Sequence, residues 1–244
     1  MTPIAAGVGA QLQYVSSGEG EPLLAIHGIG GSAALLSEKL SGLATSRRVI
    51  AYDRRGYGQS DAPEPYRATT VSEQSADAAA LVSALDASPA LLVGVGFGAL
   101  VALDLCLRHP QITEGAVLVD PPLYSLDVES TRELADQRGA IEAALLASDN
   151  EAAIASLLGS DPDQGLLASA QSSGAACFAD YAGLASLELT HRQLRECQVP
   201  VRILLTTAAS PAIVRIASQL DGLLGNSALL EGVSIVAAAE ALLD

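Results

Sequence analysis

Residues 90–101 read ALLVGVGFGALV, and this stretch decides the fold. The apolar run 90–93 is typical of a buried strand, and the apolar spacing over 99–108 is typical of a helix packed on a sheet. Between them, Gly94, Gly96 and Gly98 indicate a sharp turn. The stretch therefore predicts a strand, a glycine-rich turn and a helix in direct succession.

The same alternation extends toward the N-terminus. We expect strands at 23–26 and 48–52, each ending in a glycine-containing loop, and helices at 33–43 and 72–85. Ser72 is the expected N-cap of the second helix. Strands that alternate with helices predict an α/β fold with a mostly parallel sheet covered by helices on both faces.

Downstream of the central stretch, a strand at 116–119 is followed by a long segment without strand signal. We expect a small helical cap inserted at about 123–197, and its apolar spacing predicts helices at 130–146, 151–158, 165–181 and 183–195. Strands then return at 201–205 and 228–230, each followed by a helix, at 211–220 and 236–243. The sequence thus predicts one domain over residues 1–244 with a cap insertion.

Composition excludes several partners and cofactors. A net charge of −15 argues against a nucleic-acid backbone or an anionic membrane surface, which both need a basic face. The three cysteines are widely spaced and form neither a disulfide framework nor a zinc motif. The N-terminus lacks a signal-peptide pattern. We expect a cytoplasmic protein without metal or cofactor, and the alanine- and arginine-rich composition suggests a bacterial source.

Two further motifs precede the central glycines. The first is HGIGG at 27–31 and the second is YDRRGYGQS at 52–60. In this order, and together with GVGFG at 94–98, they resemble the α/β-hydrolase fold family, in particular its small bacterial esterase, enol-lactonase and haloperoxidase-like members. The resemblance covers nearly the whole chain outside the cap. It implies the α/β-hydrolase fold and a pocket between sheet and cap.

The resemblance also assigns roles to the glycine-rich loops. In the family, two backbone amides form an oxyanion hole, and they match Ile29, which follows Gly28, and Phe97. His27 matches a structural histidine beside that hole. The residues 53–55 match side chains that stabilise the second motif's loop.

The catalytic side chains of the family have no counterparts at the matching positions of this sequence. A serine nucleophile belongs at Gly96, an acid at Ala209 within one residue, and a histidine base at Ile235. All three positions carry apolar or absent side chains. The resemblance therefore implies a degenerate triad, which excludes the usual serine-hydrolase chemistry.

Two alternative uses of nearby residues stay open. Gly94, Gly96 and Ala99, with Asp120 after the next strand, also fit a dinucleotide-binding pattern, although the two upstream motifs have no role in such a site. Asp120 or Tyr124, at the entrance to the cap, could act as a solitary general acid or base. A turn or cap role is the simpler interpretation of both.

Three functions follow from these residues. The first is a non-hydrolytic pocket protein that binds a small apolar or carbonyl-containing molecule. The second is an enzyme such as a cyclase, lyase or isomerase, in which the amides of Ile29 and Phe97 orient a carbonyl substrate. The third is a weak or conventional ester hydrolase. In each case we expect a small-molecule ligand or substrate as the partner.

Overall fold

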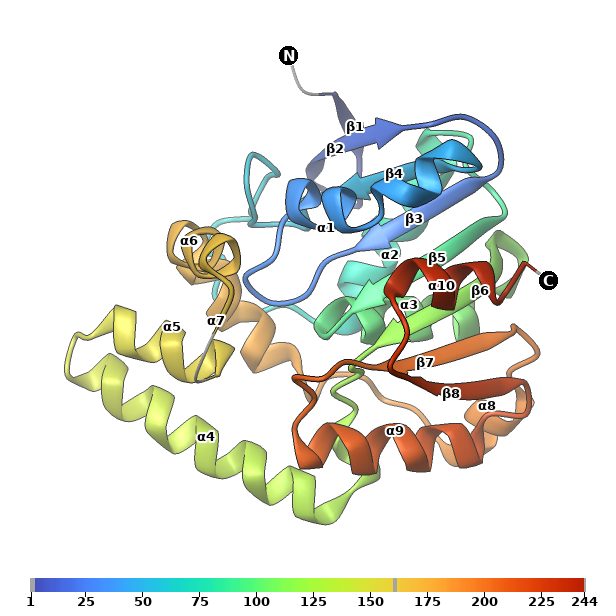
Figure 1. The fold of residues 1–244 in the computed structure, drawn as a ribbon. Helices are drawn as coiled ribbons and strands as arrows, with labels where there is room; N and C mark the ends of the chain where they lie inside the picture. The colour runs from blue at the N-terminus through green and yellow to red at the C-terminus, as the bar shows by residue number, and fades with distance from the viewer. Residues whose placement is uncertain (1–2, 160–161, 244) are drawn as a thin grey trace.

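A sheet of eight strands runs through the computed structural model, which describes residues 3–159 and 162–243 (Figure 1). Its strand order is β1-β2-β4-β3-β5-β6-β7-β8; β1 pairs with β2 and β2 with β4 in antiparallel fashion, and the other pairs are parallel. The strands are β1 Ile4–Ala6, β2 Gln11–Ser17, β3 Pro22–Ile26, β4 Arg48–Tyr52, β5 Ala90–Val95, β6 Thr113–Val119, β7 Val201–Leu205 and β8 Ser227–Glu231.

Helices cover both faces of this sheet. One face is covered by α1 (Ala33–Lys39) and α10 (Ile235–Glu240), and the other by α2 (Val71–Ala84), α3 (Phe97–Arg108) and α9 (Pro211–Leu223) (Figure 1). The period of two in a strand places successive β5 side chains in different cores: those of 91 and 93 pack with α1 and α10, and that of 92 with α2 and α3. Two 3-10 helices, η1 (Ser41–Thr45) and η2 (Pro110–Ile112), lie in connections.

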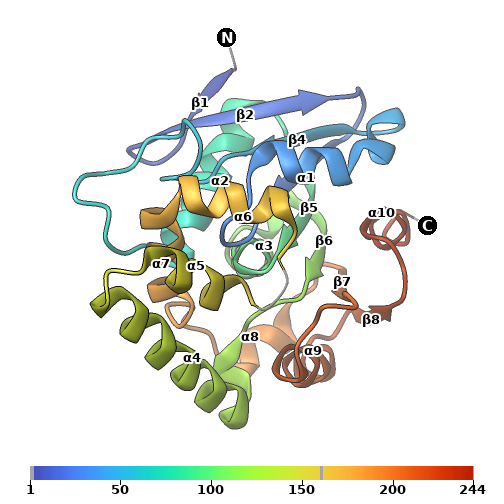
Figure 2. The same cartoon turned by 60° about the vertical axis from the view of Figure 1, so that its left-hand side comes forward.

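The helical insertion lies between β6 and β7; most of it lies beyond the carboxyl ends of the parallel strands (Figure 2), and its last helix packs beside α9. It contains η3 Tyr124–Leu126, α4 Val128–Leu146, α5 Asn150–Leu158, α6 Gln164–Ser172, α7 Gly174–Gly183 and α8 His191–Glu196. We use "cap" below for α4 to α7. Side chains cap the N-termini of α4, α5 and α6, which are preceded by Asp127, Asp149 and Asp163.

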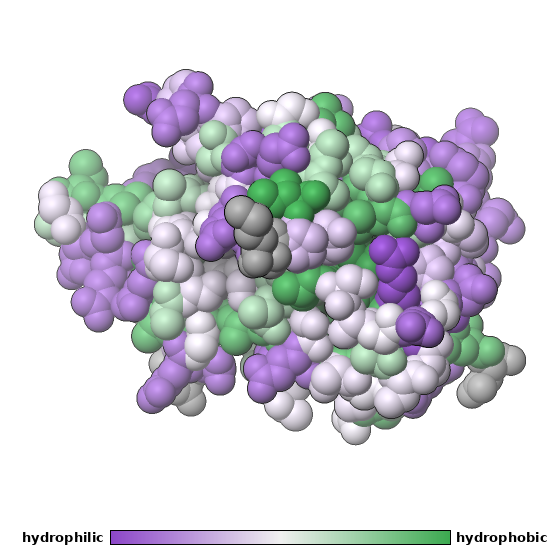
Figure 3. All heavy atoms as spheres, turned by 90° about the horizontal axis from the view of Figure 1, so that it is seen from above, coloured by the Kyte–Doolittle hydropathy of each residue, from purple (hydrophilic) through white to green (hydrophobic). Residues whose placement is uncertain are grey.

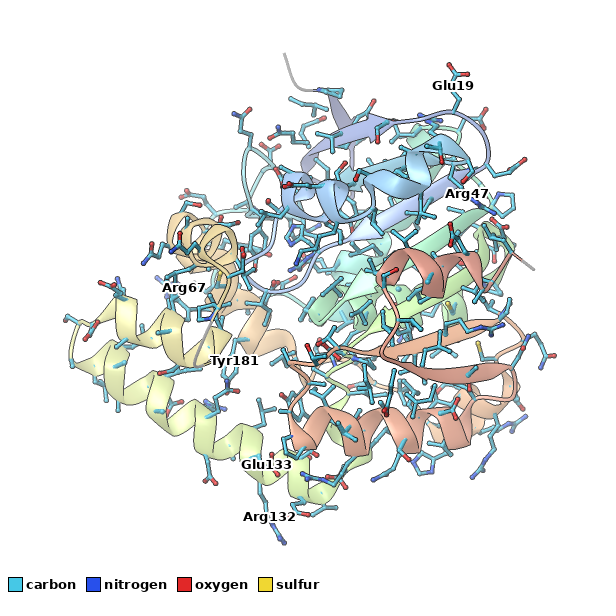
Figure 4. All side chains as sticks on the ribbon, viewed as in Figure 1. Glu19, Arg47, Arg67, Arg132, Glu133 and Tyr181 are labelled. Carbon is cyan, nitrogen blue, oxygen red and sulfur yellow. The ribbon has the colours of Figure 1, made fainter. Side chains whose placement is uncertain are left out.

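An ion-pair cluster joins α4 to α9. The Arg215 guanidinium contacts Asp127 at 3.1 Å and Glu133 at 2.6 Å. In Figure 4, Glu133 lies near α9 and Arg132, its neighbour on α4, points away from the molecule. One end of α4 is thus fixed to the sheet's helical layer.

The fold confirms the predicted mostly parallel sheet with helices on both faces, but several element ends differ. Strands β1 and β2 were not predicted, because β1 is short and β2 is mostly half-buried. Ser72 as an N-cap is wrong: α2 begins one residue earlier, and the Thr70 hydroxyl accepts the Glu73 amide. The helix expected over 33–43 ends at Lys39 and continues as η1.

The cap differs more from its prediction. The helix expected over 165–181 is two helices, which meet at Ser173, whose backbone leaves the helical region. The helix expected over 183–195 is confined to α8, since a capping box between Thr190 and Gln193 starts it there. The division into one domain with a cap at about 123–197 stays a prediction.

Within the described ranges, no helix is both long and apolar enough to cross a bilayer. Seen from above in Figure 3, the most hydrophilic residues lie mainly around the edge of the face, and hydrophobic residues gather in smaller patches between them. Ile4 and Val8 are among the exposed apolar residues of the chain.

Candidate functional site

The turn between β5 and α3 has a backbone conformation that would strain any residue except glycine. Gly96 has φ 54° and ψ −120°, and its amide donates to the Val119 carbonyl at 2.9 Å. Its two neighbouring glycines are sterically required. A Cβ at Gly94 would lie 2.3 Å from the Gly98 carbonyl oxygen, and one at Gly98 would lie 2.1 Å from the Ile26 carbonyl oxygen. The elbow therefore depends on close backbone packing at 94 and 98.

Gly96 itself has room for a side chain. A Cβ there would meet only the Gly28 Cα within 4 Å, at 3.8 Å, which is an ordinary van der Waals contact. Only the positive φ disfavours another residue, at a cost of about 1 to 3 kcal/mol. The elbow therefore differs from a nucleophile elbow in lacking a reactive side chain at position 96, and the surrounding packing does not require glycine there.

Two backbone amides beside the elbow are free to bind an oxygen atom. Phe97 is the first residue of α3, so its amide has no partner within the helix. Neither that amide nor the amide of Ile29 donates to a protein acceptor among the described residues. A Cβ at Gly28 would lie 2.8 Å from the Val95 carbonyl oxygen, so glycine there allows the two loops to approach.

His27 is held inside the loop by both ring nitrogens. Nδ1 donates to the Gly28 carbonyl at 2.8 Å, and Nε2 accepts the Arg54 amide at 3.1 Å. Burial, and then the charge of Arg54, hold the pKa of His27 well below its usual value, although the bond to Gly28 opposes this shift. The imidazole is thus neutral, with its acceptor nitrogen already occupied, and it cannot serve as a general base.

Arg54 links the loop that carries Ile29 to helix α7. Its Nε and Nη2 donate to the carbonyls of His27 and Gly28 at 2.9 and 3.2 Å, and Nη1 donates to Asp180 at 3.0 Å. Both side chains are fully buried. Burial lowers the pKa of Arg54, but Asp180, Tyr57 and Tyr52 together outweigh burial and raise it. The cap and the candidate oxyanion loop therefore share one buried ion pair.

Tyr57 reinforces the same link. Its hydroxyl donates to Asp180 at 2.6 Å and lies 3.4 Å from the Gly30 amide. The Arg54 guanidinium also lies over the rings of Tyr57 and Phe97, 4.9 and 5.0 Å from their centroids. One polar cluster thus contacts both amide-bearing segments.

The other two charged residues of the motif at 52–60, Asp53 and Arg55, bond to helices α1 and α2. Asp53 accepts the Ala33 amide at the start of α1 at 2.7 Å; burial raises the pKa of its carboxyl, and that hydrogen bond partly offsets the rise. Arg55 donates to Asp77 at 2.6 Å and to Glu73 at 2.5 Å, both on α2. All three charged residues of the motif therefore have structural partners.

A cavity of about 390 Å³ lies between the elbow and the cap, and the Ile29, Gly96 and Phe97 segments form part of its wall. Leucine side chains from α1, α5, α6 and the end of α7 also line it: Leu35, Leu36, Leu157, Leu158, Leu166 and Leu184. A cavity of this size, mostly apolar with a few directed polar groups, is typical of small-molecule sites.

Asp120 and Tyr124 also line the cavity. Asp120 has φ 46°, and its two carboxylate oxygens accept the Thr206 amide at 3.0 Å and the Thr206 hydroxyl at 2.5 Å. Tyr124 is half-buried; burial, and then the charge of Glu133, raise the pKa of its hydroxyl. Both residues proposed as a solitary acid or base thus face the ligand space.

The other two positions matched to a triad lie elsewhere. Ala209 packs near the helices of one sheet face, Ile235 begins α10 on the opposite face, and neither lines the cavity. His109, at the far end of α3, and His191, exposed at the start of α8, are also outside it. Among the described residues, Gly96 is therefore the only one of the three matched positions on the cavity wall.

Sequence reasoning missed several residues of this site. Ser32, Lys39 and Gln137 line the cavity, and Asp180 holds Arg54. Ser32 could have been found from the local sequence, because it directly precedes α1 and its hydroxyl accepts the Leu35 amide as the N-cap of that helix. The other three carry no motif, and only the folded cap brings them to the site. Over the described ranges, no cluster of three His, Cys, Asp or Glu side chains is arranged to bind a metal ion.

The strand order, the elbow and the amide pair agree with one family. The sequence profile of the alpha/beta hydrolase fold matches residues 21–164, more than half of the chain. The chain belongs to the α/β-hydrolase fold family. This confirms the family named from the three glycine-rich motifs.

Curated relatives match part of the chain. An uncharacterized hydrolase, YraK of Bacillus subtilis, is 34% identical over 48% of this chain and 44% of its own length. The putative non-heme bromoperoxidase BpoC of Mycobacterium tuberculosis is 36% identical over 44% and 41%. A 2-hydroxymuconate semialdehyde hydrolase of Pseudomonas sp. is 40% identical over 48% and 41%. The matched segment thus spans less than half the length of these relatives.

Solved structures share the fold over nearly the whole chain. A hydrolase from Pseudomonas aeruginosa has a TM-score of 0.81 at 22% identity, with 99% of this chain and 98% of that chain covered. The enol-lactonase of Burkholderia xenovorans has a TM-score of 0.68 at 20% identity, with 98% and 95% covered. At these identities the likeness concerns the fold alone.

Proposed function

We propose that this α/β-hydrolase-fold protein binds a small apolar molecule through a carbonyl group and does not hydrolyse it. The observation that carries the proposal is the elbow at Gly96. It keeps the positive φ of the turn and two free amides beside an apolar cavity, yet it has no side chain that could attack a carbonyl. The site can therefore hold a carbonyl oxygen without forming an acyl intermediate.

The chemistry of the cavity supports binding over cleavage. A serine elbow needs an imidazole that accepts its proton. His27 is the only histidine on the cavity wall among the described residues, and its Nε2 already accepts the Arg54 amide. Each amide would contribute a hydrogen bond worth about 1 kcal/mol to a bound oxygen. Burial of the ligand's apolar part would supply the rest of the affinity.

We keep a cyclase, lyase or isomerase as the second candidate, because Asp120 and Tyr124 line the same cavity as the Ile29 and Phe97 amides. Amides that polarise a carbonyl acidify its neighbouring C–H bonds, and a carboxylate could remove such a proton. This enzyme would orient its substrate and move a proton without a nucleophile. A weak or conventional ester hydrolase is the third candidate.

The binding proposal is tested by titrating ¹⁵N-labelled protein with 2-pentanone, a neutral ketone with no ester bond. We expect saturable shifts of the Ile29 and Phe97 amide signals. Gly96→Leu should abolish them by filling the ligand space. Gly232→Leu is the matched control, since Gly232 also has positive φ and an open surrounding but lies outside the cavity wall. Absence of saturable shifts at both amides in the wild type would refute the proposal.

The enzyme alternative has its own measurement. In D₂O, proton abstraction beside the carbonyl would exchange the ketone's α-hydrogens for deuterium, which ¹H NMR detects. The binding proposal predicts exchange no faster than in buffer. Exchange that is accelerated by the wild type and lost in Asp120→Asn or Tyr124→Phe would favour the isomerase-type enzyme.

We further propose a small molecule as its partner and the cytoplasm as its location. The acidic composition and the three buried, unpaired cysteines support these two proposals.

A further inference from the structure

The cap contains a second cavity, of about 460 Å³, between α4 and α7. Its wall is mainly apolar and includes Leu134, Ile141, Leu145 and Phe178. None of these four residues lines the cavity at the elbow. The second cavity therefore extends the apolar space of the cap beyond the candidate site.

The two cavities share part of their walls. Tyr181 and Leu184 line both of them. In Figure 4, Tyr181 lies on the side of α4 that faces the body of the molecule. Its hydroxyl donates to the Leu134 carbonyl on α4 at 3.2 Å, and burial raises the pKa of this hydroxyl to about 12, so it remains a neutral donor. Tyr181 and Leu184 thus form a partition between the two spaces.

Polarity differs between the two ends of this combined space. The elbow end offers the two free amides of Ile29 and Phe97. At the α4 end, Arg138 and Glu142 also line the cavity, but they pair with each other at 2.7 Å and are mostly exposed. No unpaired charge in the described wall of the second cavity would attract a polar ligand group. The arrangement suits a molecule with one carbonyl end and one apolar end.

We propose that the two cavities form a single site for a long-chain carbonyl compound, whose apolar chain passes Tyr181 and Leu184 and ends between α4 and α7. This inference rests on the proposed function, because the amides at the elbow bind the carbonyl. Tyr181 and Leu184 then determine specificity for chain length. Short ligands fill only the elbow cavity, and long ligands fill both.

The test is a calorimetric titration with 2-pentanone, 2-nonanone and 2-tridecanone. Each buried methylene should lower Kd about fourfold, and this gain should continue through the longest ketone in the wild type. Ala135→Trp should stop the gain at an intermediate length, because Ala135 is an exposed wall residue of the second cavity alone. Ala140→Trp is the matched control, since Ala140 is exposed on the same helix and lines neither cavity.

Two partition variants provide an independent readout. Tyr181→Ala should widen the connection and tighten binding of 2-tridecanone by about tenfold or more. Tyr181→Phe removes only the bond to Leu134 and should have a smaller effect. The inference is overturned if the wild type and the Ala135→Trp variant show the same dependence of Kd on chain length.

Failure of this inference is distinguishable from failure of the proposed function. If 2-pentanone binds at the amides but chain length has the same effect in all variants, only the inference fails. If no ketone binds, both fail. Sedimentation of the same variants tests whether the second cavity is instead a contact between two copies of the chain. The inference is overturned if the wild type is a dimer that Ala135→Trp dissociates while the ketone affinities stay unchanged.

Discussion

Gly96 differs from the glycines around it in what its position requires. Gly94 and Gly98 sit where a Cβ would overlap backbone oxygens, whereas Gly96 faces open space and has only its positive φ to favour glycine. The residue that should carry chemistry in this family is therefore the one whose side chain the fold could most easily accept. The packing of the elbow thus depends on Gly94 and Gly98, whereas its lack of a reactive side chain depends on Gly96.

Glycine-to-alanine substitutions at 96 and 98 measure this difference as a difference in stability. We expect Gly96→Ala to lower the free energy of unfolding by about 1 to 3 kcal/mol, the cost of positive φ. Gly98→Ala, which also forces a Cβ against Ile26, should lower it by more or prevent folding. Urea denaturation of the three proteins gives these values. Equal losses for the two variants would contradict the difference in packing.

The buried imidazole of His27 predicts a pH dependence of stability. Its pKa is lowered in the folded protein, so below about pH 6.5 the unfolded chain binds a proton that the folded chain does not. The contribution of His27 to the free energy of unfolding is therefore complete above pH 6.5. It is lost as the pH falls below that value, by at most about 1.4 kcal/mol per pH unit. His27→Gln should flatten the dependence of the free energy of unfolding on pH between pH 7 and 5. Parallel profiles for the wild type and His27→Gln would disprove the prediction.

At the scale of elements, one buried ion pair connects the cap helix α7 to the loop after β3. Asp180 of α7 holds Arg54, which in turn holds the carbonyls of His27 and Gly28. A carbonyl and the amide after it belong to one planar peptide unit. Fixing the Gly28 carbonyl therefore fixes the direction of the Ile29 amide. The cap thus helps to orient the site that it covers.

Removal of one partner of this pair should be costly. We expect Asp180→Ala to lower the free energy of unfolding by about 3 to 5 kcal/mol, because it leaves a buried guanidinium unpaired. Glu196→Ala, which removes the exposed pair of Glu196 with Arg192, should cost less than about 1 kcal/mol. Chemical denaturation compares the two variants. Similar losses for both would show that Asp180 does not hold the loop.

The loops after β7 and β8 carry the other two positions that match the family's triad. Ala209 and Ile235 do not line the cavity, so we expect an acid and a histidine placed there to contribute little to a serine at the elbow. We expect Gly96→Ser combined with Ala209→Asp and Ile235→His to hydrolyse 4-nitrophenyl butyrate less than tenfold faster than Gly96→Ser alone. A much larger gain would show that these loops bring the two positions to the elbow.

At the scale of the whole molecule, sequence patterns predicted the parallel core because each central strand is a continuous apolar run. They missed β1 and β2, where burial is partial and the alternation is weak. The amides of Ile29 and Phe97 could be located because the glycine-rich motifs resemble those of the α/β-hydrolase family, in which the matching amides form an oxyanion hole. Asp180 and the second cavity could not, since they depend on how cap helices without motifs pack together.

We propose that the cavity binds a carbonyl compound without nucleophilic attack on it. Intact-mass spectrometry after incubation with a serine-directed phosphonate tests this most directly, because it also reports on Ser32, the serine that lines the cavity among the described residues. We predict that the protein's mass remains unchanged. A stoichiometric adduct that peptide mapping places on a cavity residue would contradict the claim.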